Sequence, residues 1–449
     1  MEFKDLNRLL PEHVDGHKPL NNVADAPSPE ELTNFLESVF RSNLPPEKLS
    51  PVIGFDIPPF TLDEIRKAVG KLKHRRCPDP CGIVAEMFRF ANDEILVCLM
   101  DIFNRMIHSG VLESNWQSTF FTMLFKSGEK KDPGNWRPVA LLHISYKIFS
   151  NLLHGRLSAQ LESRQPDDQI GFRRSCGVDD AFVVLETVCS NSLEWNFNCW
   201  FASLDLKKAF DRIEHVSLFC ALHHHGVGHE YVKLITMLYR EQTGYIKGGR
   251  AFAIERGVRQ GDVISPLFFN AGLELALERW KRRLGDCGLH VGCTERLTNV
   301  RYADDLVLFA KSWCELVRML EILIEELHGI GLALNPSKTK LFTTFGVDTP
   351  TLIEVAGHFL EVVTRQESHK YLGKMLSGNF TERRVADLAY RKKCAWNKFH
   401  KFKHILLNKH ISLRLRLKFF DSVISPTILF GLATTALPKS EISKLDSLR

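Results

Sequence analysis

The stretch Val300-Arg301-Tyr302-Ala303-Asp304-Asp305-Leu306-Val307-Leu308-Phe309 sets two adjacent acids between two apolar, strand-like runs. This pattern predicts a tight β-hairpin with both acids at its tip. It is a poor turn sequence, because the favoured hairpin turns take Asn-Gly or Asp-Gly, whose central residues adopt positive φ. Two like charges about 4 Å apart also repel by roughly 1 kcal/mol in water, and by several-fold more in a partly dry cleft.

Two interpretations of this hairpin remain open on local grounds. It is either a solvated turn that happens to hold two acids, or part of a site completed by a cation, most simply Mg²⁺, which prefers hard oxygen ligands. Asp205 favours the second, because it lies near the end of the apolar run of residues 199–206, where an acid costs several kcal/mol unless it is paired, solvated or metal-bound. If these strands are neighbours in one sheet, three carboxylates converge and can hold two metal ions for phosphoryl transfer.

The length and composition are those of a soluble globular protein with two or three subdomains. The chain has 449 residues, of which 44% are hydrophobic and 25% charged. No apolar run approaches the roughly 18 residues needed to span a membrane, and the N-terminus lacks the apolar core of a secretory signal. We therefore expect an intracellular protein, and the sequence leaves open whether it lies in the nucleus or the cytoplasm.

The eleven cysteines are scattered without a Cys-x-x-Cys pair. Cys77 and Cys81 have one possible metal-binding spacing, but no matching Cys/His pair follows them. This favours reduced, mostly buried thiols over a disulfide framework or a zinc site.

The positive charge is concentrated near the C-terminus. The chain carries a net charge of +6, whereas residues 381–420 hold twelve lysines and arginines and two acids, a net +10, which leaves −4 for the rest. A basic segment on a mildly acidic body predicts that a polyanion is bound on one side and a metal in a cleft elsewhere. Trp396, Phe399, Phe402 and Phe419 interleave with these charges; the alternative is a pair of basic amphipathic surface helices.

Helix caps and periodicity predict most of the secondary structure. Ser28 and Thr61 are expected N-caps, Thr61 with Glu64 in a capping box, and Ser265-Pro266 is a third helix start. The expected helices cover residues 29–40, 62–72, 83–110 (in two pieces), 141–162, 177–195, 265–285, 313–329 and the tail from 381; the expected strands cover 120–126, 199–206 and the segment running into 342.

Three basic segments suggest contacts with phosphates. Residues 73–82 could face phosphates or form a solvated connector. The loop of residues 127–138, with Lys126 before it, is either a triphosphate clamp or an exposed basic loop, and residues 169–174 could contact a template backbone.

Six motifs in order then resemble a known family. Asp-x-x-x-Ala-Phe-Asp (205–211), Arg-Gln-Gly-x-x-x-Ser-Pro (259–266) and Tyr-Ala-Asp-Asp (302–305) are similar to those of the reverse transcriptases of non-LTR (LINE-like) retrotransposons. Residues 135–142, 334–340 and 371–373 extend the similarity, which covers roughly residues 58 to 445. Residues 77–82 depart from the Pro-Gly-Pro-Asp-Gly-like loop of that family.

The resemblance implies an α+β, right-hand polymerase fold with fingers, an antiparallel-sheet palm and a helical thumb. The implied division is an N-terminal extension (1–58), fingers (59–198), palm with insertions (199–375) and a truncated thumb or connector (376–449). The implied activity is that of an RNA-directed DNA polymerase, which extends a primer 3′-hydroxyl with dNTPs using two Mg²⁺ ions, or Mn²⁺. The alternatives are an RNA-templated RNA polymerase and an inactive remnant that only binds nucleic acid.

The resemblance also implies partners and residue roles. The partners would be an RNA template, a DNA primer, dNTPs and the element RNA, without a membrane, and a separate endonuclease would act in trans or from a missing segment. The implied roles are catalytic and metal-binding for Asp205, Asp304 and Asp305, dNTP-binding for Arg137, Lys126, Phe210, Gln260 and Gly261, candidate general acid for Lys338, and primer grip for Tyr371, Leu372 and Gly373.

Overall fold

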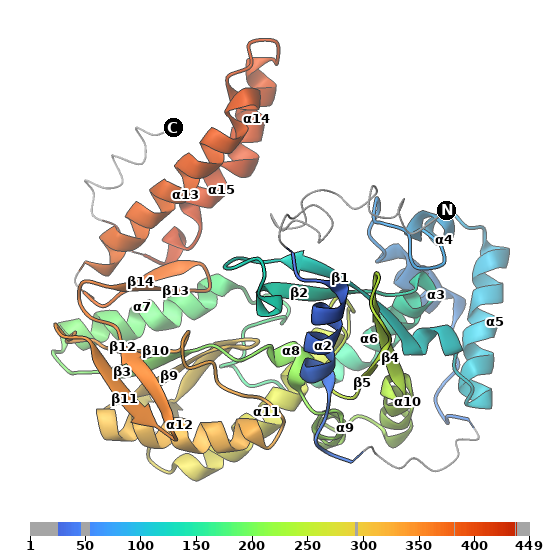
Figure 1. Cartoon of the computed structure of the whole chain (residues 1–449), viewed down its shortest axis with the longest axis horizontal. Coiled ribbons are helices and arrows are strands. Elements are labelled where there is room, and N and C mark those ends of the chain that lie inside the picture. Colours follow the sequence, from blue (N-terminus) through green and yellow to red (C-terminus); the bar gives the residue numbers. More distant parts are fainter. Residues whose placement is uncertain (1–25, 46–53, 292–294, 381, 436, 438–449) are drawn as a thin grey trace. The chain divides into compact units, whose positions relative to one another are not determined.

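The computed structural model describes residues 26–45, 54–291, 295–380, 382–435 and 437, and is an α+β structure, as expected (Figure 1). Two compact units each combine distant parts of the chain: unit 1 holds Met1–Gln165, Lys208–Arg279 and Glu326–Leu332, and unit 2 holds Pro166–Lys207, Trp280–Glu325 and Ala333–Arg449. Residues 1–25 and 46–53 of the predicted extension, and residue 381 of the basic segment, lie outside the described residues.

Unit 1 is built on a four-stranded sheet in the order β2-β1-β4-β5. The strands are β1 (Ser118–Phe125), β2 (Trp136–Leu141), β4 (Gln242–Ile246) and β5 (Phe252–Ile254). β1 pairs antiparallel with β2 and parallel with β4. Strand β2 corrects the prediction of a loop up to residue 138: Pro138 is accommodated because β2 is an edge strand, where a missing N–H removes no bond to a second neighbour.

The helices of unit 1 begin largely where their caps predict. α2 (Pro29–Phe40) and α3 (Leu62–Gly70) both start with complete capping boxes at Ser28 and Thr61. The others are α4 (Ala85–Arg89), α5 (Asp93–Ser109), α6 (Ile144–Ser163), α8 (Ala209–Arg212), α9 (His215–His224) and α10 (His229–Tyr239). α11 (Ser265–Leu284) runs on into unit 2.

Helix α2 is packed on unit 1 rather than loosely tethered to it. The Arg256 guanidinium donates a hydrogen bond to the Val39 carbonyl at 2.8 Å and pairs with Glu214. The rings of Phe40 and Phe121 stack at 5.4 Å, so the helix shares the aromatic core of the four-stranded sheet.

Unit 2 is built on a six-stranded sheet in the order β11-β12-β10-β3-β9-β8. The strands are β3 (Trp200–Leu204), β8 (Asn299–Tyr302), β9 (Asp305–Ala310), β10 (Lys340–Thr343), β11 (Thr351–Val355) and β12 (His358–Val362). The sheet is antiparallel, as expected, except that β10 pairs parallel with β12. Two small hairpins, β6–β7 (Leu289–Val291, Glu295–Leu297) and β13–β14 (Ser368–Tyr371, Lys374–Ser377), complete the unit's strands.

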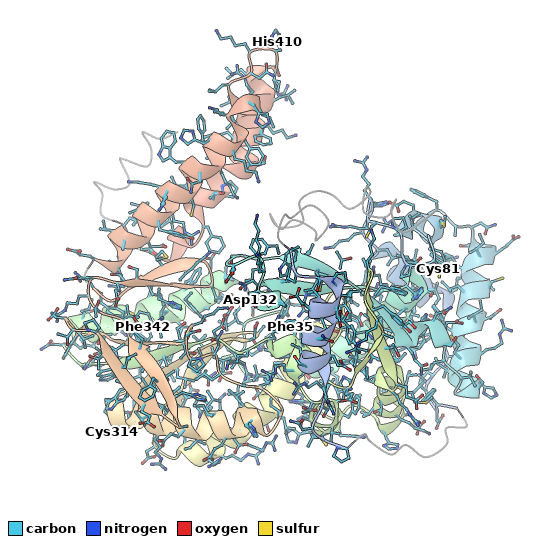
Figure 2. The ribbon with its side chains drawn as sticks, viewed as in Figure 1. Phe35, Cys81, Asp132, Cys314, Phe342 and His410 are labelled. Carbon is cyan, nitrogen blue, oxygen red and sulfur yellow. The ribbon has the colours of Figure 1, made fainter. Side chains whose placement is uncertain are left out.

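An aromatic ladder forms the core of the six-stranded sheet. Phe201 stacks on Phe342 with ring centroids 4.7 Å apart and lies beside Phe309 at 6.3 Å. Phe182 and Leu185 of α7 (Val178–Glu194) belong to the same buried cluster. Figure 1 shows α7 on one face of the sheet and α12 (Trp313–His328) on the other, and Figure 2 labels Phe342 within it.

The basic C-terminal segment folds as α13 (Arg383–Leu406), α14 (Leu413–Val423) and α15 (Ser425–Leu429). Its aromatic residues mostly do not face solvent: Phe399, Phe402 and Phe419 pack against a buried cluster between the helices, whereas Trp396 is half exposed. Glu186 of α7 anchors the start of α13 through an ion pair with Arg383 at 3.0 Å. No helix within the described residues is both long and apolar enough to cross a membrane.

The stability of unit 1 is expected to depend on pH through His215. Its Nε2–H donates to the Gly257 carbonyl at 2.8 Å, and burial lowers its pKa from 6.5 to about 4. Between these pH values the unfolded chain binds a proton at His215 that the folded chain does not. The contribution of His215 to the free energy of unfolding is therefore greatest above pH 6.5, and this free energy falls by at most about 3 kcal/mol as the pH drops toward 4.

Denaturant unfolding at pH 7 and pH 4.5 measures this effect. His215→Gln keeps a donor for Gly257 but cannot titrate, so the variant should lose less stability than the wild type between the two pH values. The matched control is His410→Gln, since His410 is exposed at the far end of the α13–α14 pair (Figure 2) and should leave the pH dependence unchanged. Equal losses in the wild type and His215→Gln would contradict the assignment.

Candidate active site

The hairpin predicted at residues 300–309 is present in unit 2. β8 and β9 pair from Asn299↔Leu308 to Tyr302↔Asp305, so the two-residue turn is Ala303-Asp304. Asp305 therefore begins β9 and is not at the tip, which corrects the expectation that both acids lie there. Ala303 has φ of 58°, the positive value that a type II′ turn requires at its first central residue, and a residue with a Cβ adopts it at a steric cost.

The register of the sheet brings the third acid to the same end. β3 and β9 pair antiparallel from Trp200↔Ala310 to Leu204↔Leu306, so the next pair along is Asp205 and Asp305. Because opposite residues in an antiparallel pair point to the same face, both acids lie on the face that carries Phe201 and Phe309. Acids that the sequence separates by a hundred positions thus lie at the same end of two neighbouring strands.

Asp205 is held by the segment that precedes β10. The Asn335 side-chain amide donates to Asp205 Oδ2 at 2.8 Å, and the Asn335 backbone N–H donates to the Asp205 carbonyl at 2.8 Å. Lys338 Nζ lies 3.9 Å from the same Oδ2, on a side chain that is 59% exposed. The carboxylate of Asp205 is thus oriented by a neutral donor and lies near one exposed cation.

The segment of residues 169–171, which we call the brace, supports the hairpin through hydrogen bonds. The motifs alone did not connect this segment with the hairpin. Gln169, fully buried, accepts hydrogen bonds at Oε1 from the backbone N–H groups of Gly171 (2.9 Å) and Ala303 (3.3 Å). A Cβ on Gly171 would lie 2.4 Å from the Ala303 nitrogen. Glycine is required here because the backbones of the brace and the turn touch.

The structure gives the same segment an internal role, and the template contact expected of it stays a prediction. Arg173 donates to the carbonyls of Pro166 (2.7 Å) and Gln169 (3.0 Å), which stabilises the loop that carries the brace. The sequence signal that could have indicated this was the Gln-x-Gly spacing, since a buried amide next to a glycine is typical of close backbone approach.

Tyr371 is the last residue of β13, and Leu372 and Gly373 form the turn of the β13–β14 hairpin. Leu372 and Gly373 both have positive φ, 46° and 89°, as a type I′ turn requires. The Gly373 carbonyl accepts from Arg391 of α13. Tyr371 is buried, and its hydroxyl has no hydrogen-bond partner among the described residues. Burial raises the pKa of this phenol well above its usual value, and the charge of Asp305 adds to the effect.

In unit 1 the Arg-Gln-Gly motif is held by a buried polar network. Gln260 Nε2 donates to Asp211 Oδ1 at 2.6 Å. The backbone carbonyl of Gln260 accepts from the Ala140 N–H at 3.1 Å. Gly261 has φ of 108°, which only glycine adopts without strain. The buried Arg259 guanidinium donates hydrogen bonds to the carbonyls of Trp116 and Leu238, and these bonds hold the start of the loop in place.

Asp262 and Phe210 complete this part of unit 1. The Tyr146 hydroxyl donates to Asp262 Oδ2 at 2.7 Å, and burial raises the pKa of that phenol well above its usual range. Phe210 is partly exposed and stacks on the buried ring of Phe269 with centroids 4.2 Å apart. This stacking fixes the plane of the Phe210 ring and leaves part of it accessible.

Three cations gather on one side of the four-stranded sheet. Arg137 pairs with Leu124 across β1 and β2, so Arg137 and Lys126, two residues past Leu124, point to the same face. Lys208, which the motif comparison did not single out, lies 3.4 Å from the Trp136 carbonyl and 4.7 Å from the centre of the Phe35 ring. Burial lowers the pKa of Lys208. The charges of Asp211 and Asp132 oppose this shift, and those of Arg137 and Lys126 add to it.

Comparison with known proteins identifies the family of this chain. Residues 128–376, more than half of the chain, match the family model described as reverse transcriptase (RNA-dependent DNA polymerase). The chain belongs to the reverse transcriptase family. This confirms the resemblance drawn from the motifs, and the span contains Asp205, Asp304 and Asp305.

Relatives of this reverse transcriptase come from mobile elements. The chain is 29% identical over 275 residues to the Retrovirus-related Pol polyprotein from type-1 retrotransposable element R2 of Popillia japonica, covering 59% of this chain and 38% of that protein. It is 24% identical over 440 residues to the RNA-directed DNA polymerase from mobile element jockey of Drosophila melanogaster, covering 93% and 45%. The chain therefore spans less than half the length of these relatives. An apo telomerase structure from Candida Tropicalis aligns with a TM-score of 0.42, 11% identity and coverage of 60% and 54%, too low to support a conclusion.

Reverse transcriptases generally use divalent metal ions, and the acids of unit 2 fit that chemistry. Asp205, whose side chain is 35% exposed, and the partly exposed Asp304 and Asp305 offer only oxygen ligands, which hard divalent cations prefer. Within the part of the chain that the structure describes, the side chains that bring three metal-binding atoms within 4.8 Å are instead Asp79, Cys81 and His143.

Substituting Gly171 tests the brace behind the hairpin. Gly171→Ala places a methyl group against the Ala303 backbone, so it should lower the free energy of unfolding by about 1–3 kcal/mol. It should also slow the primer extension proposed below by roughly 10²-fold, because the displaced turn carries Asp304, an acid of the proposed site. Chemical unfolding and an extension assay measure the two effects.

The matched control is the same substitution at Gly155, in the interior of α6. A Cβ there meets nothing within 4 Å, so Gly155→Ala should raise stability by about 0.5–1 kcal/mol and leave extension unchanged. Wild-type extension by Gly171→Ala would show that the turn does not depend on this contact.

Proposed function

We propose that this chain is an RNA-directed DNA polymerase that extends a primer 3′-hydroxyl with dNTPs on an RNA template. The observation that carries the proposal is the β3–β9 register, which sets Asp205 opposite Asp305 beside a braced turn that holds Asp304, in a member of the reverse transcriptase family. Three carboxylates at one end of two neighbouring strands suit in-line phosphoryl transfer.

Asp205, Asp304 and Asp305 would hold two Mg²⁺ ions, with Mn²⁺ as a substitute. When bound, such ions lower the pKa of the primer hydroxyl and neutralise charge on the leaving pyrophosphate. The chain itself contributes orientation: the Asn335 amide fixes one oxygen of Asp205. Lys338, exposed and 3.9 Å from that oxygen, is the candidate general acid for the leaving pyrophosphate, because its flexible ammonium can reach and release a proton.

We assign dNTP binding to residues of unit 1. Arg137 and Lys126 on one sheet face would contact the triphosphate, and Lys208 adds a third charge to that face. Gln260, oriented by Asp211, and Gly261, with no side chain, would line the nascent base pair. The Phe210 ring, fixed by Phe269, would exclude a ribose 2′-hydroxyl.

The remaining assignments follow the division into an N-terminal extension (1–58), fingers (59–198), palm (199–375) and thumb or connector (376–449). Tyr371, Leu372 and Gly373 would form the primer grip, on a turn tied to α13. The basic surface of α13 and α14 would follow the duplex backbone. The natural template would be the element RNA, with a separate endonuclease activity supplying the primer end.

Primer extension on an RNA template with a DNA primer, dNTPs and Mg²⁺ tests this function. Asp304→Asn and Asp205→Asn should each lower the extension rate at least ~10²-fold, because losing a charged ligand forfeits several kcal/mol of transition-state stabilisation. Primer–template binding should be retained.

The matched control is Asp348→Asn, which neutralises an exposed acid whose contact is an ion pair with Arg365 at 2.9 Å. It should extend at the wild-type rate. A wild-type chain that does not extend would refute the polymerase assignment for this chain, and equal extension by all three variants would refute the assigned site.

Sugar selection tests the role of Phe210. Phe210→Ala should raise NTP incorporation relative to dNTP incorporation on the order of 10-fold or more, because a steric contact with one hydroxyl is worth ~1–3 kcal/mol. Phe359→Ala, at a ring that is 64% exposed on β12, is the control and should leave the ratio unchanged. An unchanged ratio of NTP to dNTP incorporation in Phe210→Ala would contradict the role in sugar selection and leave Phe210 with a packing role only.

A further inference from the structure

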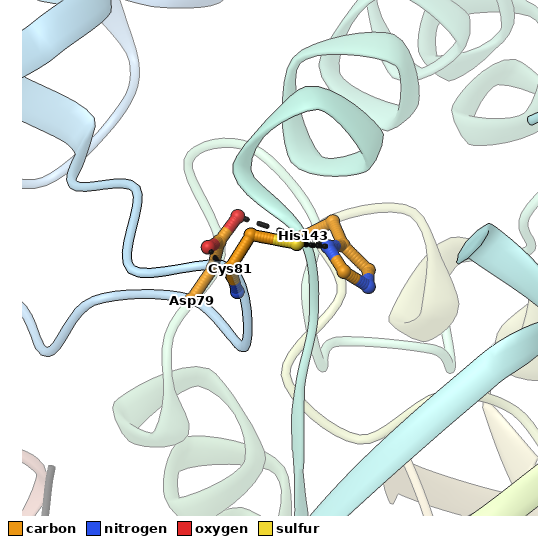
Figure 3. A group of neighbouring side chains, drawn as sticks. All are labelled: Asp79, Cys81 and His143. Atoms are coloured by element: carbon orange, nitrogen blue, oxygen red, sulfur yellow. Dashed lines mark hydrogen bonds and ion pairs between the residues drawn. The ribbon is translucent and has the colours of Figure 1, made fainter. Parts of the chain in front are cut away.

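A cluster of metal-binding side chains lies in unit 1, outside the polymerase site proposed above. Cys81 Sγ is 3.7 Å from His143 Nδ1, and Asp79 Oδ2 is 3.8 Å from the same nitrogen (Figure 3). The three ligand atoms all lie within 4.8 Å of one another. Asp79 and Cys81 belong to the loop where the motifs depart from the family pattern, and His143 precedes α6.

The geometry is that of ligands around a common point and not that of a nucleophilic relay. In a Cys-His-Asp relay the thiol and the carboxylate contact opposite nitrogens of the imidazole. Here both face Nδ1 (Figure 3). The 3.8 Å between Nδ1 and the carboxylate oxygen is also too long for a hydrogen bond.

These distances fit a tetrahedral ion. Zinc lies about 2.3 Å from sulfur and about 2.0–2.2 Å from nitrogen or oxygen, so two ligands at a tetrahedral angle are roughly 3.3–3.6 Å apart. The observed separations of 3.7 and 3.8 Å exceed this by a few tenths of an ångström. Small side-chain rotations would close the set around an ion.

The carboxylate of Asp79 is already oriented for this task. Its Oδ1 accepts from the backbone N–H groups of Cys81 and Ile83, each at 2.9 Å, and its Oδ2 accepts from the Ile144 N–H at 2.9 Å. A carboxylate has about four acceptor sites, so one on Oδ2 remains for a metal. Backbone donors that fix a carboxylate in this way are typical of the outer shell of a metal site.

We propose that Asp79, Cys81 and His143 bind one zinc ion, which ties the loop of residues 77–83 to the start of α6. A thiolate, an imidazole and a carboxylate suit Zn²⁺, whereas Mg²⁺ and Ca²⁺ prefer oxygen alone. Asp79 is 3% exposed and His143 8%, while Cys81 is exposed. The ion would therefore sit at the surface with its fourth position open to water.

Metal titration of the full chain, stripped with chelator, tests the proposal without nucleotide or nucleic acid. Co²⁺, as a spectroscopic substitute for Zn²⁺, should give a near-ultraviolet sulfur-to-metal charge-transfer band that saturates at one equivalent and is displaced by Zn²⁺. The band should disappear in Cys81→Ser and fall sharply in His143→Gln. Cys98→Ser, at an exposed cysteine on α5, is the matched control and should keep it.

Thermal unfolding distinguishes the loss of a metal ligand from misfolding of a variant. Metal-free Cys81→Ser should melt at the metal-free wild-type temperature, because Cys81 is exposed, and Zn²⁺ should raise the melting temperature of the wild type and Cys98→Ser but not of Cys81→Ser. A wild-type titration without the band, or a band retained in Cys81→Ser, would overturn the proposal. Asp304→Asn should keep the band, since ions on oxygen ligands alone give none, so this test and that of the polymerase fail separately.

Discussion

The pairing of β3 with β9 is the constraint on which the proposed site depends. Both strands are central in the six-stranded sheet, and their register, Leu204 opposite Leu306, places Asp205 opposite Asp305. A slip of one residue would turn every side chain of a strand to the other face, and would move Phe201 and Phe309 out of their shared buried cluster. The apolar core therefore fixes the position of the charged residues, because the alignment that buries the aromatic rings is the one that brings the acids together.

The charged end of these strands is supported by neutral donors more than by opposite charges. Asn335 orients Asp205 with its amide, and Gln169 holds the turn at Ala303 with a buried carboxamide. A neutral donor orients a carboxylate while leaving its charge available to a cation, whereas a buried arginine would neutralise it. The arginine and acid of the Arg-Gln-Gly-Asp loop also have neutral partners, but both are buried: Arg259 donates to the Trp116 carbonyl and Asp262 accepts from the Tyr146 hydroxyl.

The sequence predicted the local features well, for reasons that particular residues make clear. Ser28 and Thr61 begin helices because each cap satisfies backbone donors only three residues away. The hairpin and its acids were predicted from alternation and charge. Strand β2 was not, because Asn-Trp-Arg-Pro resembles a loop until pairing with β1 makes it an edge strand. The strands at residues 242–254 and 351–362 gave no local signal that prompted a prediction. Each pair forms a hairpin, but β4 joins its sheet through β1, which lies more than a hundred residues earlier, and β12 joins its sheet through β10.

The sequence by itself determined the family, the two groups of acids, the glycine-containing loops and the basic C-terminal segment, because each is a property of residues close together in the chain. Only the tertiary structure decided which distant side chains meet. It brought Gln169 to Ala303, Lys208 to the face of Arg137 and Lys126, and His143 to Asp79 and Cys81, although the cysteine spacing alone had argued against a metal there. It also packed Phe399, Phe402 and Phe419 between helices. The physical reason is that these contacts depend on how whole elements pack, and packing selects among many pairs that spacing cannot distinguish.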